Sequence, residues 1–113
     1  MLLADVVATS TSLSQTRSRR AKADLIATLL TTATEAVETE IVVTYLSGEL
    51  RQRRTGVGWR TLADAPAPAE SPSLTIEEVD QAFAELSEFA GAGSQARRRE
   101  AVDALFGRAT EDE

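Results

Sequence analysis

The sequence contains no cysteine and no histidine, and only 4% of its residues are aromatic. Without cysteine there are no disulfides, thiolate zinc sites or cysteine nucleophiles, and without histidine there is no imidazole acid–base catalyst. The core must be aliphatic and rich in alanine, which favours helices over strands. No apolar run is long enough to span a membrane, and the N-terminus lacks the basic region of a signal peptide. We therefore expect a soluble, cytoplasmic protein with no membrane partner.

The charges are unevenly distributed along the 113 residues. Eighteen acidic residues outnumber twelve basic ones, which gives a formal net charge of −6. A phosphate, however, responds mainly to charges within about 10 Å, so local clusters matter more than the total. Eleven of the cations are arginine, whose planar guanidinium suits phosphate contacts. They form three clusters with Lys22: Arg17, Arg19, Arg20 and Lys22; Arg51, Arg53, Arg54 and Arg60; Arg97, Arg98, Arg99 and Arg108.

Apolar residues recur at three- and four-residue spacing in the first half of the chain. This spacing predicts a helix over residues 2–13, a second over 17–33 and a third that follows Thr34 as N-cap and ends near Gly48. The β-branched run at 41–43 allows a short strand instead, although no alternation surrounds it. After it, "TGVGW" predicts a turn and "WRTL" the start of a short helical segment.

A proline-rich segment divides the chain. Residues 63–73, "ADAPAPAESPS", contain all three prolines and no large apolar side chain, which is typical of a linker. We predict a first helical subunit at 1–62, the linker at 63–73 and a second helical subunit at 74–113. The expected fold class is all-α, with helical hairpins on either side of the linker.

The second subunit opens with a capping box at 75–78, which predicts a fourth helix with an apolar face. "GAGS" interrupts it, and Ser94 is predicted to cap a fifth helix that carries the third arginine cluster. Near the end of the chain, Thr110 followed by three acidic residues has the pattern of another helix start. That tail is either a disordered terminus or the opening of a longer polypeptide.

Four segments carry a resemblance to a known family. "MLLADVVATS", "YLSGELRQRRTGVGW", "LTIEEVD" and "GAGSQARRREAVDALFGRATEDE" resemble, in the same order, the N-terminal DNA-binding region of actinobacterial ATP-dependent DNA ligases. The resemblance implies that this chain is about half of a pseudo-twofold helical domain that holds nicked double-stranded DNA through the minor groove. It also implies DNA repair, replication or recombination as the process, and a cytoplasmic, nucleoid-associated location.

The same resemblance implies a division of labour along the polypeptide. Family members continue into further helices, a nucleotidyltransferase domain and an OB-fold, and the full-length enzyme uses ATP and Mg²⁺. This chain has one lysine, Lys22, and no K-x-D-G motif, whose lysine accepts AMP in the family. We therefore expect no cofactor and no ligation by this chain alone, and the ligase catalytic domain as its partner in cis.

Two glycine–arginine segments are the predicted DNA-binding surface. Minor-groove contact needs cations together with positions where the backbone can approach without a Cβ. In the second segment a helix N-terminus adds free N–H donors. The predicted contacts are Arg51, Arg53, Arg54, Gly56 and Gly58 in the first segment, and Gly93, Ser94, Arg97 and Arg98 in the second.

Each of these features also has an ordinary structural interpretation. A G-x-G with no preceding strand is usually a turn, and a run of charges is usually a solvated helix face. Trp59 is predicted to lie in the core, because an intact duplex offers no unstacked base for it to receive.

Three functions therefore stay open: sequence-independent DNA binding, a helical protein–protein adaptor, and a complete enzyme, against which the missing chemistry argues. If the chain is part of a larger helical domain, the inward faces of the fourth and fifth helices lack cover. The isolated chain would then be marginally stable or self-associate. The residues concerned are Val79, Phe83, Leu86, Val102, Leu105 and Phe106.

Overall fold

The computed structural model describes residues 1–113 and contains six α-helices. Its β-structure is limited to an isolated antiparallel bridge between Leu2 and Thr75. The predicted all-α fold is confirmed, and the run at 41–43 is helical. The helices are α1 (Leu3–Ser14), α2 (Arg19–Leu30), α3 (Ala36–Leu46), α4 (Trp59–Ala63), α5 (Ile76–Glu88) and α6 (Ser94–Arg108).

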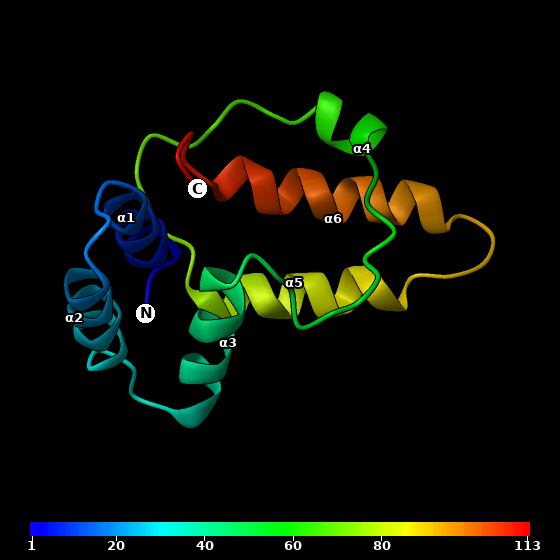
Figure 1. Cartoon of the computed structure of the whole chain (residues 1–113). Coiled ribbons are helices and arrows are strands. Elements are labelled where there is room, and N and C mark those ends of the chain that lie inside the picture. Colours follow the sequence, from blue (N-terminus) through cyan, green and yellow to red (C-terminus); the bar gives the residue numbers. More distant parts are fainter.

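The helices form an elongated molecule that measures 50 × 28 × 24 Å. α1, α2 and α3 lie together at one end, where α1 contacts both of the others (Figure 1). α5 and α6 form an antiparallel hairpin that extends away from this end, and α5 contacts α3. The short α4 lies beside α6, and the segments before and after α4 run along the hairpin (Figure 1).

The main core is aliphatic, as the low aromatic content predicts. Ile76, the first residue of α5, is buried among residues of α1, α2 and α3, so the hairpin is attached to the three-helix end through its own N-terminus. Two backbone hydrogen bonds reinforce this attachment: Leu3 N–H donates to the Leu74 carbonyl at 2.9 Å, and Ile76 N–H donates to the Met1 carbonyl at 3.0 Å. The buried cluster is Val6, Leu29, Ile41, Val42 and Ile76. The subunit boundaries at 62 and 74 stay predictions.

A buried carboxylate fixes the start of α3. Glu38 is 2% exposed, and one of its oxygens accepts a hydrogen bond from the Met1 ammonium at 2.8 Å. Its other oxygen accepts from the Thr34 hydroxyl at 2.7 Å and the Thr34 backbone N–H at 2.9 Å. These hydrogen bonds, chiefly the one from the ammonium, lower the pKa of Glu38 from 4.5 to about 2. The prediction that Thr34 is the N-cap is wrong: Glu35 holds that position, and the Thr34 hydroxyl is a donor to Glu38.

The remaining helix starts follow the sequence in one case and differ in two. Thr75 caps α5, because its hydroxyl accepts from Glu78 N–H at 3.2 Å. Ser94 does not cap α6: Gly93 is the N-cap, with a φ of 78° that turns the chain so sharply that Ser94 is already helical. No helix begins at Thr110, whose N–H donates to the Glu113 carboxylate at 2.7 Å. None of the six helices is both long and apolar enough to cross a membrane.

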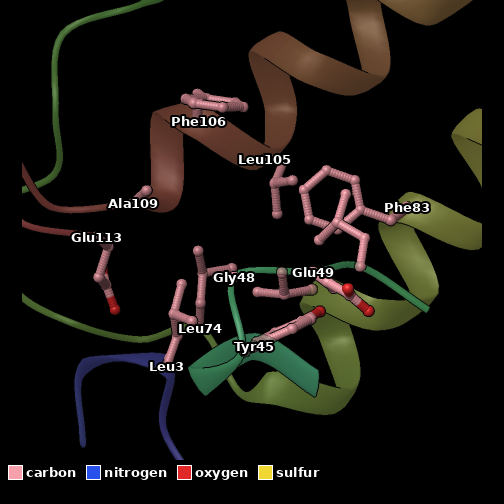
Figure 2. Close-up of a pocket in the computed structure, with 12 residues that line it drawn as sticks. Leu3, Tyr45, Gly48, Glu49, Leu74, Phe83, Leu105, Phe106, Ala109 and Glu113 are labelled. Carbon is pink, nitrogen blue, oxygen red and sulfur yellow. The ribbon is translucent and has the colours of Figure 1, made fainter. Parts of the chain in front are cut away.

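The hairpin buries part of its apolar surface and leaves part of it open. Val79, Leu86 and Val102 are buried, so the prediction that they lack cover is wrong for these three. The other three residues of that prediction, Phe83, Leu105 and Phe106, line an open cavity of about 290 Å³. Tyr45 of α3 and Leu74 also line it. Figure 2 shows Phe83 of α5 next to Leu105 of α6, with Tyr45 and Leu74 across the cavity.

Candidate nucleic-acid interface

The first glycine–arginine segment, residues 47–58, connects α3 to α4 and runs along α5 (Figure 1). Arg51 fastens its beginning: the guanidinium lies 2.7 Å from an Asp80 carboxylate oxygen of α5 and 3.4 Å from one of Glu40 of α3. The Gln52 amide donates to the same Asp80 carboxylate at 3.1 Å and to the Asp80 carbonyl at 3.2 Å. Arg51 therefore already has two acidic partners within the protein.

Two more cations follow Arg51 in this segment and a third, Arg60, lies in α4, and none of the three has such a partner. Arg53, Arg54 and Arg60 are exposed and make no side-chain hydrogen bond or ion pair within the chain. Trp59 lies between them in sequence, and 88% of it is exposed. The prediction that Trp59 is a core residue is wrong. It is the first residue of a five-residue helix whose more buried residues are Thr61 and Leu62, and α4 contributes no residue to the buried core.

The second glycine–arginine segment joins α5 to α6, and its arginines fold back onto the turn. The Arg97 guanidinium lies 5.5 Å from the centre of the Phe89 ring and donates to the Ala90 carbonyl at 3.3 Å. Arg98 donates to the Phe89 carbonyl at 3.0 Å and is only 8% exposed. Gly91 and Gly93 both have positive φ, at 82° and 78°, and make the reversal possible.

The structure brings the two predicted segments into contact. At Gly56, whose φ is 72°, an added Cβ would lie only 2.6 Å from Arg98 Nε. Gly56 and Arg98, which are 42 positions apart by their numbers, are therefore direct neighbours. Gly58 is the N-cap of α4, with an extended φ of −114° and open space where its Cβ would be. Whether any of the predicted contacts touches DNA stays a prediction.

The other clustered cations divide in the same way into braced ones, which have a hydrogen-bond or ion-pair partner within the chain, and free ones, which have none. Arg99 lies 3.4 Å from Asp64, and Arg108 lies 2.8 Å from Glu78 and donates to the Ser73 carbonyl. These pairs tie α6 to the segment that follows α4 and to α5. The cluster at α2 is exposed and makes no side-chain hydrogen bond or ion pair, at the end of the molecule away from α4 (Figure 1). Its members are Arg17, Arg19, Arg20 and Lys22.

The family resemblance implies ATP and Mg²⁺ for the full-length enzyme, and that this chain binds neither by itself stays a prediction. No group of three or more His, Cys, Asp or Glu side chains is arranged to hold a metal ion. Lys22 is followed by Asp24, but Leu25 stands where the K-x-D-G motif requires glycine.

Comparison with known proteins gives an independent observation. The chain is 55% identical over 113 residues to a protein named "Probable DNA ligase" from Beutenbergia cavernae, 54% identical over 117 residues to one of that name from Nocardioides sp., and 51% identical over 114 residues to one from Mycobacterium marinum. All of this chain is covered in each case, but only 22%, 23% and 22% of the respective relatives. No protein-family profile and no solved structure matches the chain.

These matches confirm the resemblance that the four segments carry, and they cover all 113 residues. The chain spans about a fifth of the length of the curated relatives that it matches. Over its whole length, this chain corresponds to the N-terminal part of actinobacterial proteins named as DNA ligases.

Proposed function

We propose that this chain binds double-stranded DNA, preferably nicked, through phosphates and the minor groove, as the N-terminal DNA-binding part of an ATP-dependent DNA ligase. The observation that carries the proposal is the match of the whole chain to DNA ligases at 46–55% identity. A ligase must hold its DNA whatever the sequence, which requires contacts to the backbone rather than to base edges. Such a role belongs to DNA repair, replication or recombination, on chromosomal DNA in the cytoplasm.

The contact surface that we propose combines the free part of the first glycine–arginine segment with the start of α4: Arg53, Arg54, Gly56, Gly58, Trp59 and Arg60. We name it the α4 turn. Its three arginines have no acidic partner, so they reach a phosphate without first breaking an internal ion pair. Gly58 carries no side chain that would keep a phosphate from the backbone, and the space where its Cβ would be is open. The exposed indole offers apolar surface to the sugar edges of the groove.

The test is a salt titration of duplex binding. Trp59 is the only tryptophan, so its fluorescence should report occupancy of the α4 turn directly. We expect similar affinities for duplexes of unrelated sequence, falling steeply between about 50 and 200 mM salt. Replacing Arg53, Arg54 and Arg60 together by Gln should lower the slope of log K against log salt by about 0.9 for each phosphate that is no longer neutralised.

Two control variants remove the same charge elsewhere. The triple replacement of Arg17, Arg19 and Arg20 by Gln changes the free cluster on α2, and that of Arg97, Arg99 and Arg108 changes braced arginines. We expect both to retain most of the salt slope. Equal reduction in all three variants would show a general charge effect, and binding that ignores salt would rule out phosphate contact. The adaptor alternative, which has no nucleic-acid role, predicts no duplex binding at any salt concentration, and the ligase relatives do not favour it.

Ligation is proposed only for the longer polypeptide, with the catalytic domain in cis supplying the ATP and Mg²⁺ chemistry. Incubated with ATP and Mg²⁺, this chain should form no covalent AMP adduct on Lys22, because the glycine of the K-x-D-G motif is missing. Mass spectrometry of the intact chain tests this directly. An adduct at Lys22 would contradict the proposed division of labour.

Self-association of the isolated chain is also a proposal. The open cavity beside Phe83, Leu105 and Phe106 exposes apolar surface that a second copy would cover. Sedimentation at increasing protein concentration should show a shift from monomer to dimer, and Phe106→Asp should abolish the shift. A strict monomer at all concentrations would contradict this proposal and leave DNA binding untouched.

A further inference from the structure

Arg98 is a buried cation that has no acidic partner. It is 8% exposed, its single hydrogen bond goes to the Phe89 carbonyl at 3.0 Å, and its Nε is buried without an acceptor. No carboxylate lies within ion-pair distance of it, unlike its neighbour Arg99. Burying a guanidinium without an anionic partner costs free energy, which points to a structural task for this side chain.

The position of the guanidinium indicates that task. Three of its atoms, Nε, Cζ and Nη2, lie 2.6, 2.7 and 2.9 Å from where a Cβ of Gly56 would be. The side chain thus fills the space beside the backbone of the α4 turn at Gly56, a residue that lies between Arg54 and Trp59 in the sequence. Gly56 also has a φ of 72°, which favours glycine, and a Cβ at this position would force the Arg98 guanidinium to shift.

We infer that Arg98 is a positioning residue for the α4 turn: it supports the backbone at Gly56 and so holds Arg53, Arg54 and Trp59 where they meet DNA. This inference rests on the proposed DNA binding. It differs from the sequence-based prediction, in which Arg98 contacts a phosphate itself. The planar guanidinium bridges the Phe89 carbonyl of the hairpin and the turn, so the hairpin supplies rigidity to a segment that has little regular structure of its own.

A pair of glycines provides a matched test. Gly48 lies in the same segment and has a similar φ of 79°, but nothing lies within 4 Å of where its Cβ would be. Gly56→Ala and Gly48→Ala therefore introduce the same backbone strain, and only Gly56→Ala also meets Arg98. Arg98→Met removes the guanidinium but keeps an apolar side chain. Together with the double variant Gly56→Ala/Arg98→Met, these changes form a double-mutant cycle that measures the coupling between the two residues.

The first measurement uses no DNA. Limited trypsin digestion of the full chain should cleave after Arg53 or Arg54 several-fold faster in Gly56→Ala and in Arg98→Met than in Gly48→Ala. The double variant should show less than the product of the two single effects, because each change disturbs the same contact. Circular dichroism of each variant confirms that the helices remain. Arg98→Lys should behave as Arg98→Met, since lysine keeps the charge but lacks the planar fork.

The second measurement is the affinity for a short duplex. We expect a several-fold decrease in Gly56→Ala and Arg98→Met, and little change in Gly48→Ala. Equal trypsin sensitivity in Gly56→Ala and Gly48→Ala, or rescue by lysine, would overturn the positioning role of Arg98. A loosened α4 turn with unchanged DNA affinity would instead overturn the proposed DNA contact at that turn, so the two failures are distinguishable. A lower salt slope in Arg98→Met without faster cleavage would show direct phosphate contact and overturn the inference.

Discussion

The two glycine–arginine segments look alike in sequence and differ in what their cations do. The second reverses α5 into α6, and its arginines end on the Phe89 and Ala90 carbonyls of the same turn. The first stretches from α3 to α4, and after Arg51 has paired with Asp80 its remaining arginines point to no internal acceptor. One segment uses its charges to hold a hairpin, and the other leaves them free for a ligand.

The difference follows from the distance to an acceptor. A tight reversal leaves carbonyl groups without helical partners, and a guanidinium one or two turns into the next helix reaches them. An extended crossing over a helix surface meets acceptors only where that surface supplies them, as Asp80 does for Arg51. Spacing of glycine and arginine therefore does not by itself identify a phosphate site. The absence of an internal partner narrows the free cations to those of the α4 turn and those at α2.

The largest expected effect is on the free energy of unfolding, and it tests whether the α5–α6 hairpin is packed more tightly than the first glycine–arginine segment. Leu86 of α5 is 1% exposed, and Leu86→Ala should lower the free energy of unfolding by about 2–5 kcal/mol, the usual cost of a cavity in a core. Leu50→Ala, at a residue of the first segment that is 40% exposed, should cost no more than about 0.5 kcal/mol. Urea unfolding measures both, and equal costs would contradict the contrast between the packed hairpin and the exposed first segment.

The next effect is the loss of stability at low pH that we expect from Glu38 of α3, the helix that precedes the first segment. The folded pKa of Glu38, about 2, lies below its ordinary value of 4.5. The Glu38 contacts therefore stabilise the fold above about pH 4.5, and this contribution disappears as the pH falls toward 2. Glu38→Gln should be less stable than the wild type at pH 7, with the gap narrowing in acid.

The control for this prediction is the neighbouring Glu35, which is exposed and has no side-chain cap hydrogen bond. Glu35→Gln should follow the wild type across the pH range in thermal melts. A gap between Glu38→Gln and wild type that stays constant down to pH 2 would show that the carboxylate charge is not the stabilising feature.

A smaller effect concerns two glycines of the hairpin, one of which has a positive φ and one of which is helical. Gly91 has a φ of 82° and no atom within 4 Å of where its Cβ would be, so Gly91→Ala should cost only the strain, about 1–2 kcal/mol. Gly107 lies inside α6 with ordinary contact to Pro66, and Gly107→Ala should stabilise by up to about 1 kcal/mol. Opposite signs in thermal melts support this interpretation, and a stabilising Gly91→Ala would contradict it.

The smallest effect is expected where the first segment leaves α3. The Tyr45 hydroxyl is buried without a hydrogen-bond partner, and burial, followed by the nearby Asp80 carboxylate, raises the pKa of Tyr45 to about 12. Tyr45→Phe removes an unsatisfied group, so stability should be unchanged or higher by up to about 1 kcal/mol. Urea unfolding measures the change, and a clear decrease would reveal a hydroxyl partner.

Much of the fold could be predicted because its information is local. Apolar spacing predicted the helices, and the Thr75 cap was confirmed at 3.2 Å. Predictions that depended on a distant residue were wrong. Thr34 does not cap α3, because the Met1 ammonium and Glu38 form a buried pair there, and Trp59 is exposed, because α4 adds nothing to the core. No local sequence pattern predicts the Met1–Glu38 pair or the exposure of Trp59.

The order of the amino acids is enough to establish that the protein is helical, that its cations lie in three clusters, and that its whole length resembles part of a DNA ligase. Folding decides which arginines are braced and which are free, and it places Arg98 beside Gly56. The physical reason is range. Helix formation is set by neighbours three and four residues apart, whereas the role of a charge depends on acceptors that only the folded chain brings within hydrogen-bond reach.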